Sequence, residues 1–145
     1  MELIALSLQI NGLLQEYIKI HDDIFAFSIR KIIPFPIIFK PIDYKSHYEN
    51  LCSIKAELQK VKNSTDAFSN NNIEFAKAIK QYCEALLATI NILCKMCNNL
   101  YEKSTGNLTS YSKSQYNADF DNYQSSIEKY RISGNELNFH FQKTQ

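Results

Sequence analysis

The chain has 145 residues, about one domain's worth, and its 16 Lys and Arg nearly balance its 15 Asp and Glu. Hydrophobic residues make up 45% of the sequence, which excludes wholesale disorder, and only 3 Gly and 3 Pro argue against a turn-rich β fold. The charges are spread evenly along the chain, so we expect no basic face for DNA or RNA.

The first predicted helix covers residues 2–32. Its apolar residues alternate spacings of three and four, and the stripe on the opposite side is mostly polar. Pro34 and Pro36 end the helix near residue 32, because proline cannot continue it. The predicted core positions are Leu3, Leu6, Ile10, Leu13, Tyr17, Ile20, Ile24 and Phe27.

The second predicted helix covers residues 43–68. Asp43 is an acceptable N-cap residue, and the run of Ser and Asn over 69–72 breaks the apolar pattern at the other end. The predicted core positions are Tyr44, His47, Leu51, Ile54, Leu58, Val61, Thr65 and Phe68.

The third predicted helix covers residues 72–104 and has the clearest pattern. Asn71 followed by Glu74 resembles a capping box at its start. Gly106 suits a left-handed residue just after its end. The predicted core positions are Ile79, Tyr82, Leu86, Ile90, Leu93, Cys97 and Leu100.

The fourth predicted helix covers residues 112–141. It starts within a stretch rich in Ser, Thr and Asn between Asn107 and Ser114, and residues 142–145 are expected to fray. Its tyrosine-rich face is expected mainly in the core, although its composition also suits contact with a partner. The predicted core positions are Tyr116, Phe120, Tyr123, Ile127, Tyr130, Gly134, Leu137 and Phe141.

Four long amphipathic helices with short breaks at 69–72 and 104–110 predict a single domain over residues 1–145. The repeated spacings of three and four favour left-handed packing of the coiled-coil type. The predicted fold is an all-α antiparallel four-helix bundle.

Cysteines are the main candidates for chemistry. Cys94 and Cys97 form a CxxC motif, but it lies deep inside a predicted helix rather than at a helix N-terminus, where thiols are activated. We therefore expect these cysteines to pack in the core. A metal- or thiol-dependent site built on Cys83, Cys94 and Cys97 with His47 is the alternative. No Glu-x-x-His pair and no nucleophile motif is present, so we expect no enzyme, cofactor or metal.

The segment 24–39 is apolar where connections are normally polar. It is interpreted as a hydrophobic plug over one end of the bundle, as a surface for another protein or a second copy, or as a membrane-interface segment. The candidate partner-binding residues are Ile33, Phe35, Ile37, Ile38 and Phe39.

The chain begins without a basic leader or a small-residue cleavage site, so a cytoplasmic location is expected. The functional hypothesis is a non-enzymatic protein–protein interaction module, such as an adaptor or an inhibitor or immunity-type protein that binds a larger partner. Its partner would be another protein or, in a homodimer, a second copy of this chain. The alternative is a peripheral membrane-surface protein that uses the 24–39 segment.

Overall fold

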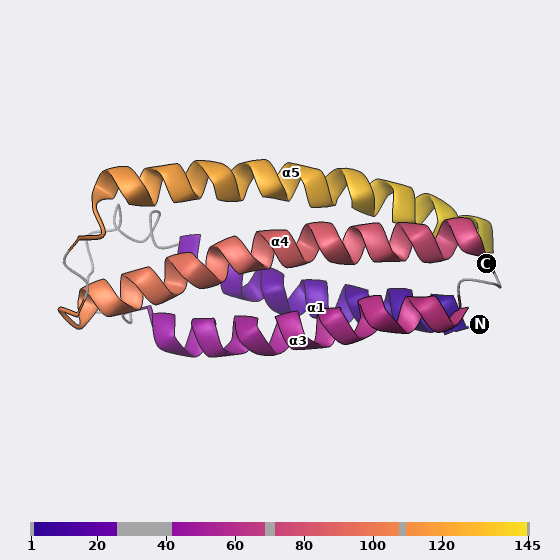
Figure 1. The fold of residues 1–145 in the computed structure, drawn as a ribbon, viewed down its shortest axis with the longest axis horizontal. Coiled ribbons are helices and arrows are strands. Elements are labelled where there is room, and N and C mark those ends of the chain that lie inside the picture. The colour runs from indigo at the N-terminus through magenta and orange to yellow at the C-terminus, as the bar shows by residue number, and fades with distance from the viewer. Residues whose placement is uncertain (1, 26–41, 69–71, 108–109, 145) are drawn as a thin grey trace.

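The computed structural model describes residues 2–25, 42–68, 72–107 and 110–144, and these form four helices without a strand (Figure 1). The helices are α1 (Glu2–Phe25), α3 (Tyr44–Phe68), α4 (Ile73–Ser104) and α5 (Lys113–Thr144). They lie side by side along one long axis, and both chain termini are at the same end of the molecule. The predicted all-α four-helix bundle is confirmed.

The packing is uneven around the bundle. α4 packs along its length against both α3 and α5, whereas α1 packs mainly against α3 and approaches α5 at few points. In Figure 1, α5 and α3 accordingly lie on opposite sides of α4. The backbones of α1 and α5 are therefore the least closely packed pair of neighbouring helices in the bundle.

The core confirms most of the predicted apolar stripes. On α3 the predicted positions from Leu51 to Thr65 are all buried, and on α1 every predicted position that the structure describes is buried except Leu6, which is half-buried. α4 buries more than its predicted stripe because it has neighbours on two faces. The additional buried residues are Phe75, Ala76, Ala78, Cys83, Thr89, Cys94 and Met96.

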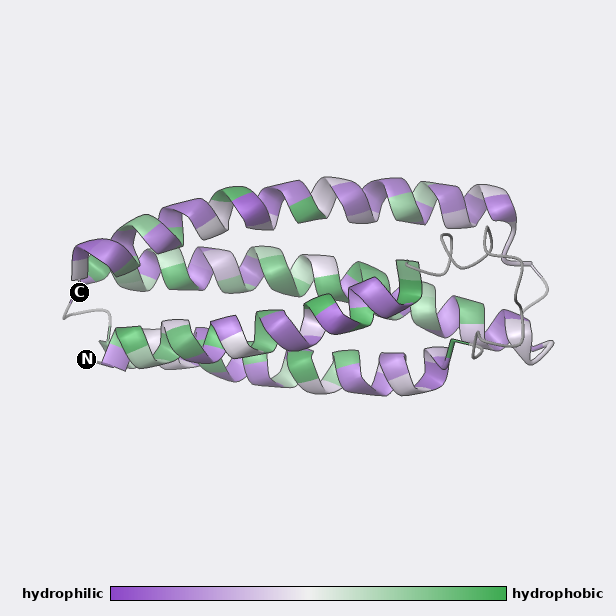
Figure 2. Cartoon of the chain, turned by 180° about the vertical axis from the view of Figure 1, so that it is seen from behind, coloured by the Kyte–Doolittle hydropathy of each residue, from purple (hydrophilic) through white to green (hydrophobic). Residues whose placement is uncertain are grey.

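The prediction overestimated how many residues of the last helix are buried. Of its predicted core positions only Tyr123 and Leu137 are fully buried, and the others are half-buried. Most of the packing of α5 is against α4, so only one flank of its apolar stripe is covered well. In Figure 2, the ribbon of α5 is coloured mostly as hydrophilic, with fewer hydrophobic residues than its neighbours.

The helix starts are fixed by side-chain caps. Asp43 caps α3 as predicted, since its Oδ1 accepts a hydrogen bond from the Ser46 amide at 3.0 Å. The cap of α4 is Asn72 and not Asn71: the Asn72 Oδ1 accepts from the Phe75 amide at 3.1 Å. The predicted capping box of Asn71 and Glu74 was therefore wrong, because the third residue after the cap is Phe75.

α4 ends as predicted at a left-handed glycine. Gly106 has a φ of 82°, and its amide donates to the Lys103 carbonyl at 3.2 Å. The next amide, that of Asn107, donates to the Glu102 carbonyl at 2.9 Å. These two bonds form a Schellman motif, which satisfies carbonyl groups that the helix end would otherwise leave unpaired.

α5 begins with a capping box that the sequence reasoning missed. The Ser112 Oγ accepts from the Gln115 amide at 3.1 Å, while the Gln115 Oε1 accepts from the Ser112 amide at 2.9 Å. The helix then continues to Thr144, past the predicted end at residue 141.

Candidate functional site

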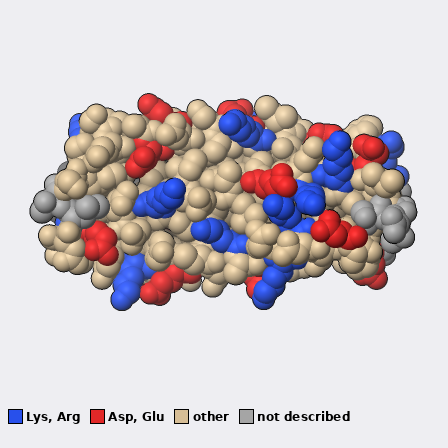
Figure 3. All heavy atoms as spheres, in the orientation of Figure 1, with Lys and Arg blue, Asp and Glu red and all other residues tan. Residues whose placement is uncertain are grey.

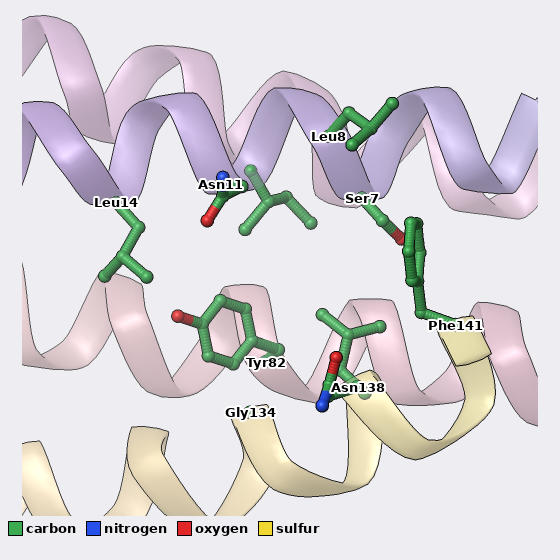
Figure 4. A pocket seen from close by; sticks show the side chains of 10 residues that line it. Ser7, Leu8, Asn11, Leu14, Tyr82, Gly134, Asn138 and Phe141 are labelled. Carbon is green, nitrogen blue, oxygen red and sulfur yellow. The ribbon is translucent and has the colours of Figure 1, made fainter.

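A groove opens between α1 and α5 in the half of the bundle that carries the two termini (Figure 4). Its volume is about 330 Å³, which lies at the lower end of the range for ligand pockets. The lining residues come from α1, α4 and α5: Ser7, Leu8, Ile10, Asn11, Leu14, Tyr82, Gly134, Leu137, Asn138 and Phe141.

The two walls have the same helical spacing. Wall residues recur at i, i+4 and i+7, as Ser7, Asn11 and Leu14 on α1 and as Gly134, Asn138 and Phe141 on α5. One face of each helix therefore lines the groove over about two turns, or roughly 10 Å.

The floor of the groove depends on Gly134. The Tyr82 ring from α4 lies between the two walls in Figure 4. A Cβ atom at Gly134 would lie 3.1 Å from the Cε2 atom of Tyr82, which is closer than an ordinary contact. The absence of a side chain at residue 134 thus lets the α5 backbone pack directly against the ring.

The lining of the groove is apolar with a few neutral polar groups, and none of the described residues that form it is charged. The Ser7 hydroxyl already donates to the Leu3 carbonyl at 3.0 Å. Asn11 and Asn138 are exposed, and within the described part of the chain neither side-chain amide is bonded to another residue. Leu8 stands at the rim with 59% of its surface exposed.

Beyond the groove, a cluster of aromatic residues connects α1 to α5. The Tyr17 and Tyr123 hydroxyl groups share a hydrogen bond, and the His21 Nδ1 lies 2.7 Å from the same Tyr123 oxygen. The Phe25 ring stacks on the Tyr123 ring, with centroids 5.5 Å apart. The Tyr130 ring meets Tyr17 edge-on at 6.2 Å. Long side chains thus bridge two helices whose backbones stay apart.

Burial shifts the pKa values of the titratable groups in this cluster. It raises the pKa of Tyr17 and of Tyr123 far above the usual range, so both phenols remain protonated. It lowers the pKa of His21, and the nearby Asp22 carboxylate opposes this only in part. The hydrogen bonds and ring contacts of the cluster join α1 to α5. Sequence reasoning expected Tyr123 in the core but did not foresee these bonds.

The three candidate cysteines lie on α4 and are buried in the core of the bundle. Cys83, Cys94 and Cys97 are free and buried, and burial raises the pKa of each thiol to about 12. Thiols with such a pKa carry almost no thiolate at neutral pH, so they are poor nucleophiles. Among the residues that the structure describes, no three His, Cys, Asp or Glu side chains are grouped to hold a metal ion.

His47 joins α3 to α1 rather than to the cysteines. Its Nε2 lies 2.6 Å from the Asp23 Oδ2, and the side chain is largely shielded from solvent. This position fits the predicted semi-buried histidine near one end of the bundle.

The candidate partner-binding residues of the apolar connection lie outside the described residues. These are Ile33, Phe35, Ile37, Ile38 and Phe39, within the undescribed range 26–41. The first two residues of the 24–39 segment are described: Ile24 is buried, and Phe25 packs half-buried against the core. Among the helices described, none combines the length and the apolar character needed to cross a membrane.

Charged side chains of both signs are intermixed on the face shown in Figure 3. Two ion pairs join α3 to α4: the Lys62 Nζ lies 3.4 Å from the Glu84 Oε1, and the Lys80 Nζ lies 3.3 Å from the Asp66 Oδ1. This face therefore offers no basic patch for a phosphate backbone.

Comparison of this chain with protein-family models, with curated proteins and with solved structures found no match. The site is accordingly interpreted from its own geometry.

Proposed function

We propose that this protein is a non-enzymatic interaction module and that its groove between α1 and α5 receives a helix from another polypeptide chain. The observation that carries the proposal is the groove itself: two helices of the bundle stand apart and expose apolar side chains between them. This role suits an adaptor or an inhibitor that acts by occupying a partner.

The shape of the groove favours a helix as its occupant. Both walls present residues at i, i+4 and i+7. Residues with this spacing form ridges, and the side chains of a packed helix fit into the grooves between such ridges. The groove runs between α1 and α5, so an added helix would pack across both of them.

The chemistry of the groove defines the contacting face of that helix. Because the lining residues that the structure describes are all uncharged, a charged side chain placed among them would lose hydration without gaining an ionic partner. The inserted face should therefore be apolar, with neutral polar groups opposite Asn11 and Asn138. Covering Leu8 completely would contribute at most about 1.5–3 kcal/mol to binding, so several such contacts are needed.

Site-specific photo-crosslinking tests the proposal. A benzophenone amino acid replaces Asn11 in the groove or, as the control, Ile132, which is 67% exposed on α5 and does not line the groove. The full-length variants are irradiated in the cells that make the protein. We expect an adduct of discrete mass from position 11 and none of that mass from position 132. Equal adducts from both positions, or none from position 11, would contradict the proposal.

A further inference from the structure

The proposed function leaves open which chain supplies the helix. We infer that it is a second copy of this chain, in a two-fold dimer where Leu8 of each copy enters the α1–α5 groove of the other. This inference rests on the proposed function and names its partner.

The first argument is the position of Leu8. It lines the groove and yet keeps 59% of its surface exposed, so a projecting apolar side chain and the hollow beside it lie on one face. A two-fold axis that passes between Leu8 and the groove would place the Leu8 of each copy over the groove of the other. Such contacts between identical surfaces are the usual basis of homodimers.

The polar side chains of the groove can pair with identical side chains of a second copy. Asn11 and Asn138 project into the groove from opposite walls (Figure 4). A side-chain amide carries both donors and an acceptor, so it can pair with an identical amide across a two-fold axis. A carboxylate or an ammonium group could not do so without repulsion. The polar groups that line this groove are therefore compatible with a second copy.

The uncharged lining of the groove also suits a second copy. Within the described part of the chain no Lys, Arg, Asp or Glu lines the groove, and the whole chain has a formal net charge of +1. Apposing two copies therefore brings no like charges together at the lining, and long-range repulsion between them is weak.

The outer face of α5 provides a matched control. Phe139 is 57% exposed, much like Leu8, but it is not part of the groove. Its ring is instead covered by the Lys143 Nζ, 5.1 Å from the ring centroid. If exposed apolar area alone caused association, replacing Phe139 would matter as much as replacing Leu8.

Sedimentation velocity over a wide concentration range tests the dimer with purified full-length protein. We expect the wild type to show a monomer–dimer equilibrium, Leu8→Asp to raise its dissociation constant at least about tenfold, and Phe139→Asp to leave it unchanged. Circular dichroism checks that each variant keeps its helicity, as an exposed position should allow. A wild type that stays monomeric, or equal effects of the two variants, would overturn the inference.

A second variant tests the two-fold geometry. Asn138→Asp places two carboxylates close to the proposed axis, so the dimer should weaken at neutral pH and recover partly in high salt, which screens the repulsion. A salt-independent dissociation constant for this variant would overturn the two-fold arrangement.

The two proposals can fail separately. A monomeric wild type whose position-11 adduct contains a different polypeptide overturns the dimer but supports the interaction module. An adduct with twice the mass of this chain supports both. A monomeric wild type that gives no adduct from position 11 overturns both.

Discussion

The hydroxyl groups of Tyr17 on α1 and Tyr123 on α5 are hydrogen-bonded to each other in the interior of the bundle. This contact, together with His21 at 2.7 Å from the same Tyr123 oxygen, joins two helices that otherwise touch little. The aromatic cluster therefore holds α1 and α5 at a distance set by the length of the tyrosine side chains. The groove lies beyond that cluster, where Ser7, Asn11 and Gly134 carry short side chains or none.

Removing the Tyr123 hydroxyl should destabilise the protein more than removing that of an ordinary half-buried tyrosine. Tyr123→Phe leaves the buried Tyr17 hydroxyl and the His21 Nδ1 without this partner, which costs about 1–3 kcal/mol of unfolding free energy. Urea denaturation measures the change. Tyr116→Phe, in a half-buried ring on the same helix, is the control and should cost less. An equal loss in the two variants would contradict a bonding role for Tyr123.

Stability should fall as the pH is lowered below about 6.5. Burial lowers the pKa of His21 in the folded state, so the unfolded chain binds a proton at a higher pH than the folded chain does. The loss begins near the unfolded pKa and continues until the pH passes the folded pKa. Urea midpoints at pH 7 and at about pH 5 measure it. His21→Gln, which cannot titrate, should flatten this dependence, and a slope identical to that of the wild type would exclude His21 as its source.

Replacing Gly12 or Gly134 with alanine should change the stability of the protein in different ways. Gly12 lies in α1 with nothing within 4 Å of an added Cβ, so Gly12→Ala should stabilise the helix by about 0.5–1 kcal/mol. At Gly134 the added Cβ would lie 3.1 Å from the Tyr82 ring, so Gly134→Ala should gain less or destabilise. Thermal unfolding at one low protein concentration compares the two variants. A larger gain at Gly134 would contradict the close packing of α5 on Tyr82.

The capping box at the start of α5 should contribute measurably to stability. Ser112→Ala removes the acceptor for the Gln115 amide and should cost about 1 kcal/mol. Ser114→Ala, at an exposed position in the same turn, is the control and should change little. Urea denaturation distinguishes them, and equal effects would show that the Ser112 cap is dispensable.

The sequence predicted the helices well because their apolar spacing is a local property. The buried positions of α3 from Leu51 to Thr65 were predicted correctly, since a single heptad stripe faces the core there. The start of α5 could also have been found, because Ser112 and Gln115 have the spacing of a capping box.

The groove could not be predicted from the same pattern. Its existence depends on which helices are neighbours and how far apart they lie, and heptad spacing encodes neither. The stripe of α5 from Tyr116 to Phe141 resembles a fully covered stripe in sequence, yet α1 leaves much of it half-buried. The candidate residues of the apolar connection, from Ile33 to Phe39, fall outside the described residues and remain predictions.

Methyl NMR during dilution tests the central claim most directly, namely that the groove between α1 and α5 is the binding surface and that a second copy fills it. The account predicts concentration-dependent shifts for the methyl groups of Leu8, Leu14 and Leu137, while Leu58, buried on the distant α3 side, stays constant. Groove methyl signals that do not change with concentration, or changes spread evenly over the core, would contradict it.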